Sequence, residues 1–162
     1  PFLQSIQSIL PIVDEFIINI GNSEDNTLEL IQSISSSKIR IIQSNWNDSM
    51  KEKGFVYGQQ KMIAHYNCTG DWAFYIEGDE VYHEDDLDRI SHSMKLYLND
   101  PNVEALVFDF KHFYGNANSF LESPGWYRSE ARIIKNSIRV YAPDGLFWVV
   151  LNLNSNKNGN TE

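Results

Sequence analysis

Short apolar runs that alternate with segments of helical periodicity constrain the fold of this chain most strongly. The runs are rich in β-branched and aromatic residues and lie at 15–20, 38–43, 72–76 and 103–110. Runs of this kind are typical of buried strands. Apolar residues recur at helical spacing in the segments 2–10, 28–34, 56–67 and 84–98. Because helix and strand alternate, we expect an α/β sandwich with a mostly parallel sheet.

The pattern changes after residue 110. Residues 111–141 are rich in aromatic side chains, Gly, Ser and Arg, with short strands expected near 132–134 and 138–141. A long irregular segment attached to a regular sheet is often a binding loop. We expect one domain over 1–150 and a disordered, asparagine-rich tail over 151–162. Since the chain opens on Pro1 inside an apolar-periodic stretch, we also expect a fragment.

Composition excludes several classes of function. The chain has 162 residues and a formal net charge of −9, which argues against non-specific binding of nucleic acid. Its one cysteine, Cys68, excludes an intramolecular disulfide and a multi-cysteine zinc site. No signal peptide or apolar run of membrane-spanning length is visible. We therefore expect a cytoplasmic location, and association with the inner face of a membrane stays open.

The stretch "YIEGDEVYHEDDLD" over 75–88 combines two kinds of acidic position. Glu77 and Asp79 follow an expected strand, at the edge where open α/β sheets bind ligands. Gly78 separates them and lets a ligand approach the backbone. Oxygen ligands at such an edge suit Mg²⁺ or Mn²⁺, although spacing alone leaves a solvated surface equally open. The acids at 84–88 fit the first turn of a helix, where negative charge is favourable.

Four motifs then point to a family. They are "SILPIVDEFIINIGNSEDNTLELI", "GDWAFYIEGDE" with "HEDDL", "FDFKHFYGN" and "WYRSEARIIKN". Over residues 1–140 the chain resembles a bacterial subgroup of the family 2 glycosyltransferases. The resemblance implies a GT-A-like (Rossmann-like) α/β/α sandwich, here incomplete because the first strand of that fold would precede Pro1. It also makes Glu77-Gly78-Asp79 the sugar-nucleotide motif, with Asp79 as principal ligand of a divalent cation that bridges the donor diphosphate.

The resemblance places further residues around the donor and the acceptor. Ile20 and Gly21 stand where the family carries acidic residues that meet the nucleoside, and Asp25 is a nearby substitute. An inverting transfer needs a general base on the acceptor side, and Glu130 is our choice. The other two candidates for the base are Glu122 and Asp144.

Aromatic and basic residues provide three more donor-binding candidates. Trp46 lines the donor pocket or caps the sheet. Trp126 either stacks on a sugar or base or anchors a loop. Arg128 either contacts phosphate, which suits its planar donors, or belongs to a solvated basic face.

The sequence thus predicts a metal-dependent glycosyltransferase domain. It would transfer a sugar, with inversion, from a nucleoside-diphosphate sugar to a sugar, lipid or protein acceptor that the sequence does not indicate. One alternative is a truncated, inactive domain that only binds metal or nucleotide. Another is an unrelated α/β module with an acidic pocket.

Overall fold

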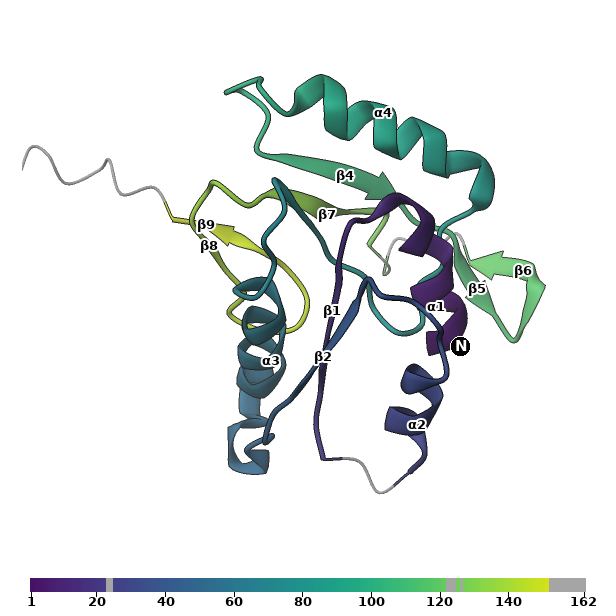
Figure 1. The fold of residues 1–162 in the computed structure, drawn as a ribbon, viewed down its shortest axis with the longest axis vertical. Helices are drawn as coiled ribbons and strands as arrows, with labels where there is room; N and C mark the ends of the chain where they lie inside the picture. The colour runs from purple at the N-terminus through teal and green to yellow at the C-terminus, as the bar shows by residue number, and fades with distance from the viewer. Residues whose placement is uncertain (23–24, 122–124, 126, 152–162) are drawn as a thin grey trace, which may run out of the picture.

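The computed structural model describes residues 1–22, 25–121, 125 and 127–151 (Figure 1). The helices are α1 (Phe2–Ile9), α2 (Thr27–Gln32), α3 (Phe55–His65) and α4 (Leu87–Tyr97). The 3-10 turns are η1 (Leu10–Ile12), η2 (Asp48–Met50), η3 (Glu52–Gly54) and η4 (Glu84–Asp86). The strands are β1 (Phe16–Ile20), β2 (Ile39–Gln43), β3 (Trp72–Phe74), β4 (Ala105–Asp109), β5 (His112–Tyr114), β6 (Asn116–Leu121), β7 (Ser129–Lys135), β8 (Val140–Tyr141) and β9 (Val149–Val150).

The predicted strands and helices at the four apolar and four periodic segments are confirmed, with shorter bounds. In α1, Ile6 and Ile9 are buried and Pro11 falls in the 3-10 turn that ends the helix. This is the expected effect of a residue that cannot donate an N–H to the preceding turn. Ile6 then forms a core cluster with Ile20 and Ile31, which joins α1 to β1 and α2.

The sheets differ from the mostly parallel sheet that the alternation predicts. β1 and β2 pair in parallel, with Phe16 opposite Ile39, and this is the sole parallel pair among the described strands. β7 lies between β3 and β4 and is antiparallel to both. The fold is therefore mixed α/β with several small sheets. Alternation along the chain could not reveal this, because β7 is a late strand that inserts between two earlier ones.

The segment expected to be irregular also contains structure. β5 and β6 form an antiparallel hairpin that turns at Gly115, whose φ of 73° lies in the left-handed region favoured by glycine. A second short pair joins β8 to β9. Figure 1 shows α4 beside β4, and α1 and α3 on either side of β1. Among the helices of the described residues, none is long and apolar enough to cross a membrane.

Candidate functional site

The turn that follows β3 brings two glutamates together. The strand direction continues past Phe74, because the N–H of Tyr75 donates to the carbonyl of Arg132 at 2.7 Å. The N–H of Glu80 donates to the carbonyl of Glu77 at 3.1 Å, and the N–H of Glu77 donates to the Glu80 carboxylate at 3.2 Å. This reciprocal pair fixes the turn and places both carboxylates on one side of it.

Arg132, on the neighbouring strand β7, pairs with both of these glutamates. Its guanidinium donates from Nε to both Glu80 oxygens, at 3.1 and 3.2 Å, and from Nη2 to Glu80 Oε1 at 2.5 Å. Nη2 also lies 3.5 Å from Glu77 Oε1. Arg132 is 1% exposed. Burial lowers its pKa, but hydrogen bonding and charge attraction to Glu80 outweigh this and raise the pKa above its ordinary value.

The two predicted metal ligands have different surroundings. Asp79 is exposed at the tip of the turn, whereas Glu77 is half-buried. Burial raises the pKa of the Glu77 carboxyl, the charges of Glu80 and Asp79 raise it further, and Arg132 opposes them. Negative charge at this turn is therefore incompletely compensated, which is a situation that a bound cation relieves.

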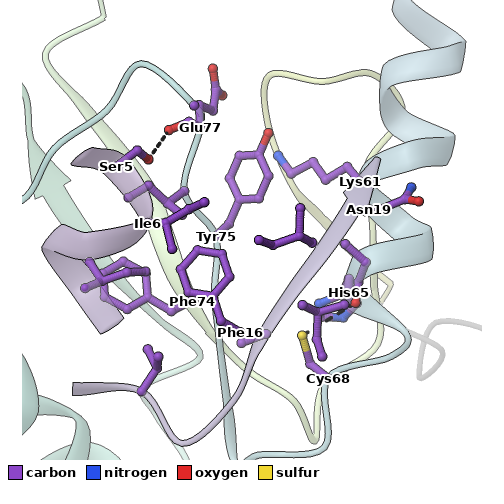
Figure 2. Close-up of a pocket in the computed structure, with 18 of the residues that line it drawn as sticks. Ser5, Ile6, Phe16, Asn19, Lys61, His65, Cys68, Phe74, Tyr75 and Glu77 are labelled. Atoms are coloured by element: carbon purple, nitrogen blue, oxygen red, sulfur yellow. Dashed lines mark hydrogen bonds between the residues drawn. The ribbon is translucent and has the colours of Figure 1, made fainter. Parts of the chain in front are cut away.

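Lys61, on α3, is a buried cation that the sequence did not single out. Its Nζ lies 3.9 Å from the ring centre of Tyr75 and 4.2 Å from that of Trp148, and it donates to the carbonyl of Gly145 at 3.3 Å. Burial lowers the pKa of Lys61 to about 8, Arg132 contributes to the lowering, and nearby carboxylates oppose it. Figure 2 shows the Lys61 and Tyr75 side chains pointing toward one another.

Glu77, Tyr75 and Lys61 line one end of a large cavity of about 1200 Å³. The cavity lies between β1 and β3, and side chains of α1, α3 and α4 contribute to its lining. Figure 2 shows Glu77 at one end and Cys68 at the other, with Ile6, Phe16 and Phe74 between them. The Ser5 hydroxyl donates to the carbonyl of Glu77 at 2.7 Å, so the first turns of α1 rest on the Glu77 end.

Trp46 also lines this cavity. A Cβ on Gly21 would lie 2.6 Å from the Trp46 ring, so the indole rests on the bare backbone at the end of β1. The Trp46 ring meets the Tyr57 ring edge-on, with centroids 5.8 Å apart. Asp144, one of the base candidates, lines the cavity as well. Gly21 therefore has a clear physical role here as a platform for an aromatic ring.

The other predicted residues are more dispersed. Asp25 is exposed at the start of α2, where its Oδ1 accepts the N–H of Thr27 at 3.0 Å. Arg128 is exposed just before β7, and Glu130 is half-buried within β7, opposite Phe108. Trp126 and Glu122 lie outside the described residues.

The acids at 84–88 occupy the helix start that their spacing predicts. Glu84–Asp86 form η4, α4 follows from Leu87, and a ring nitrogen of His83 accepts the N–H of Asp85 at 3.3 Å. In the described part of the chain, no three His, Cys, Asp or Glu side chains gather as a metal-binding group. Mg²⁺ is commonly held by one or two carboxylates together with substrate phosphates, so a site of this kind would need only Glu77 and Asp79.

Sequence reasoning missed Lys61 and Tyr75, and it treated Arg132 only as one of several basic residues near Arg128 that would contact phosphate or pair with the acidic surface. A signal for two of them is present in the sequence: Lys61 falls on the inward side of an amphipathic segment, and Arg132 interrupts the apolar run of β7. No protein-family model matches this chain, and searches of curated proteins and of solved structures returned no match either.

Proposed function

We propose that this chain is the nucleotide-sugar-binding domain of a metal-dependent glycosyltransferase with a GT-A-like sandwich. The observation that carries the proposal is the Glu77–Glu80 turn at the carboxyl end of β3. It combines an exposed acid, Asp79, with a half-buried one, Glu77, beside a cavity. Although β3 pairs antiparallel with β7, the cavity that Glu77 lines supports a substrate site here.

The carboxylates of the turn fit a divalent cation. The raised pKa of Glu77, which burial, Glu80 and Asp79 cause, marks negative charge that the turn leaves uncompensated. Glu77 and Asp79 would hold Mg²⁺ or Mn²⁺, and the oxygens of a donor diphosphate would complete the coordination. When bound, the ion would stabilise charge on the departing nucleoside diphosphate.

The remaining residues of the site would orient the donor. Arg132 would hold the Glu77 carboxylate in position, because its guanidinium contacts both Glu77 and Glu80. Trp46, 38% exposed and supported by Gly21, offers a flat face on which a base or sugar could stack. Exposed Arg128 carries planar donors suited to phosphate. Asp25, near the end of β1, would serve the nucleoside.

Glu130 is the residue that we propose as general base. It lies two residues before Arg132 on β7, and the register of β7 against β4 shifts between Ala131 and Ile133. Its charge opposes the lowering of the Lys61 pKa, which supports a role for Glu130 beside the cationic group of the site. In an inverting transfer Glu130 would accept the proton of the acceptor hydroxyl.

Calorimetric titration with Mn²⁺ and nucleoside diphosphates tests the proposal. We expect binding of nucleoside diphosphate to depend on Mn²⁺ and to weaken at least about tenfold in Asp79→Asn, because a principal ligand is lost. Asp88→Asn is the matched control, since Asp88 is a nearby acid in the first turn of α4. Equal affinities in the wild type and Asp79→Asn would contradict the proposed site.

Turnover distinguishes the transferase from its alternatives. A transferase should release nucleoside diphosphate from its donor sugar, and Glu130→Gln should slow that release without weakening donor binding. Metal-dependent binding without any release would favour a domain that only binds nucleotide. Binding of Mn²⁺ without nucleotide would favour an unrelated acidic pocket.

A further inference from the structure

The hairpin of β5 and β6 presents aromatic side chains to solvent. Phe113 is 59% exposed, Tyr114 is 70% exposed and Phe120 is 52% exposed. Gly115 lies at the turn between the strands, and a Cβ added to it would meet no atom within 4 Å. Figure 1 shows the hairpin projecting at the margin of the molecule. The three rings therefore stand on a protruding element, beyond the sheet of β3, β7 and β4.

The two faces of the hairpin have different surroundings. Phe113 is paired with Phe120 across the strands, and His112 is paired with Leu121. Because directly opposed residues share a face and neighbours along a strand alternate, the two phenylalanines lie side by side on one face. His112 belongs to the other face, and its ring meets the Tyr127 ring edge-on with centroids 4.8 Å apart. The His112 face therefore contacts the rest of the chain, and the Phe113–Phe120 face is directed to solvent.

The base of the hairpin is attached beside the acidic turn. A ring nitrogen of His112 lies 2.7 Å from the carbonyl oxygen of Tyr127. The Tyr127 ring meets the Phe110 ring edge-on, with centroids 5.3 Å apart. The guanidinium carbon of Arg132 lies 5.0 Å from the centre of the Phe110 ring, and Arg132 pairs with the glutamates of the turn at 77–80. These contacts give the exposed face a defined orientation relative to that turn.

The hairpin carries no acidic residue, although the chain is strongly acidic. The whole chain has 22 Asp and Glu residues among 162, whereas none lies between Asp109 and Glu122. Three uncharged polar residues of β6 accompany the rings, namely Asn116, Asn118 and Ser119. A charged side chain is costly to carry into a bilayer. The hairpin is therefore a segment that can approach lipid without carrying an acid into it.

The size of the exposed aromatic face decides what can cover it. Three rings at these exposures leave roughly 350 Å² uncovered, since a whole aromatic side chain offers about 200 Å². A stable interface with a second copy of the chain, or with another protein, buries about 800 Å² on each partner. A lipid surface makes no such demand, because each ring that enters the apolar region gains free energy in proportion to its own area. The small, protruding face therefore fits a lipid surface better than a protein one.

We propose that the Phe113–Phe120 face of this hairpin docks into the interfacial region of a lipid bilayer. The two phenylalanines and Tyr114 enter the boundary between headgroups and acyl chains, where aromatic side chains are favoured. The backbone groups between β5 and β6 are paired with one another, which lowers the cost of taking the hairpin out of water. The proposal is independent of the proposed glycosyl transfer.

Sedimentation with vesicles of phosphatidylcholine tests the docking. We expect the chain to bind, and the double variant Phe113→Ser with Phe120→Ser to bind at least about tenfold more weakly, because most of the inserted apolar area is lost. The matched control is Phe55→Ser with Tyr66→Ser, since these rings are 55% and 74% exposed but lie at the two ends of α3. The control should bind like the wild type. Binding should also persist in about 0.5 M salt, because screening acts on charges and not on apolar insertion.

A tryptophan at the tip of the hairpin reports insertion directly. Relative to the wild type, Tyr114→Trp should add fluorescence that brominated phosphatidylcholine quenches, because this ring lies in the lipid. The added fluorescence of Tyr66→Trp should not be quenched. This comparison does not depend on the stability of the serine variants.

Four results would overturn the proposal. The first is a wild type that does not sediment with the vesicles, and the second is equal weakening in the two serine variants, because any exposed ring would then suffice. The third is loss of binding in about 0.5 M salt, which would assign the binding to charge. The fourth is self-association of the wild type that Phe113→Ser with Phe120→Ser abolishes, because a second copy would then cover the face.

Discussion

Two groups of acidic residues lie within one short stretch and have opposite fates. Glu77 and Glu80 turn inward onto Arg132, which is almost completely buried. The acids of η4 stay in solvent, where Asp86 pairs with Arg89 at 2.8 Å while the Arg89 side chain is 79% exposed. The same residue types at similar density therefore form a buried ionic network in one place and a charged helix start in the other.

The difference follows from what lies opposite each group. The turn at 77–80 faces a strand that carries a cation, whereas the helix start faces water. A buried charge without its partner is costly, whereas an exposed pair contributes little. The contribution of these acidic residues to stability therefore depends on where Arg132 and Arg89 lie. It does not depend on how many acidic residues the stretch contains.

Replacing the buried arginine should have the largest effect. Arg132→Met removes the partner of Glu80 and Glu77, and we expect a loss of about 3–5 kcal/mol in the free energy of unfolding. Urea denaturation followed by circular dichroism measures it. Arg89→Met, the matched change at the exposed pair, should cost less than about 0.5 kcal/mol. Similar losses in the two variants would remove the distinction between the acidic groups.

Lys61 should give the next largest effect, in the dependence of stability on pH. Its pKa is about 8 in the folded chain against an ordinary 10.5, chiefly because of burial. Between pH 8 and 10 the unfolded chain keeps a proton that the folded chain releases, so the unfolding free energy should rise with pH. The rise attributable to Lys61 should be about 2 kcal/mol.

The measurement is the difference between Lys61→Met and the wild type at each pH. Subtraction cancels the opposing contribution of Cys68, whose thiol pKa is raised by burial in the folded chain. In denaturation experiments between pH 7 and 10, the unfolding free energy of the wild type should therefore rise steadily relative to that of Lys61→Met. A constant difference would mean that Lys61 does not titrate abnormally.

The smallest effect should come from the helix start. His83→Ala removes the ring nitrogen that accepts the N–H of Asp85, and we expect a cost of about 0.5–1 kcal/mol, as for other helix caps. His83→Asn keeps an acceptor and should recover most of this stability in the same denaturation assay. If His83→Ala lowered the unfolding free energy as much as Arg132→Met does, the exposed acids of η4 would also contribute strongly to stability, which would contradict the comparison.

Much of the local structure could be predicted from the sequence. The β-branched runs of β1 and β2, the stop at Pro11 and the acid-rich start of α4 are local signals, and the structure follows them. The insertion of β7 could not be predicted, because it depends on pairing between segments far apart in the chain.

The contacts of Arg132 and Lys61 around the turn at 77–80 could not be predicted, for the same reason. Arg132 reaches Glu80 only after β7 has paired beside β3. Lys61 becomes buried only where Tyr75 and Trp148 close over it. Periodicity identifies the side of an element that faces inward, but it does not identify which distant residues will meet there.

The central place of β7 also affects how the chain can fold during synthesis. β3 and β4 do not pair with each other, and both depend on β7, which leaves the ribosome after them. At translation rates of about 5–20 residues per second, β3 waits several seconds for its partner. During that interval the apolar edges of β3 and β4 are open to pairing with other nascent chains. The risk of aggregation during synthesis therefore depends on how long β3 and β4 remain unpaired before β7 emerges and pairs with both.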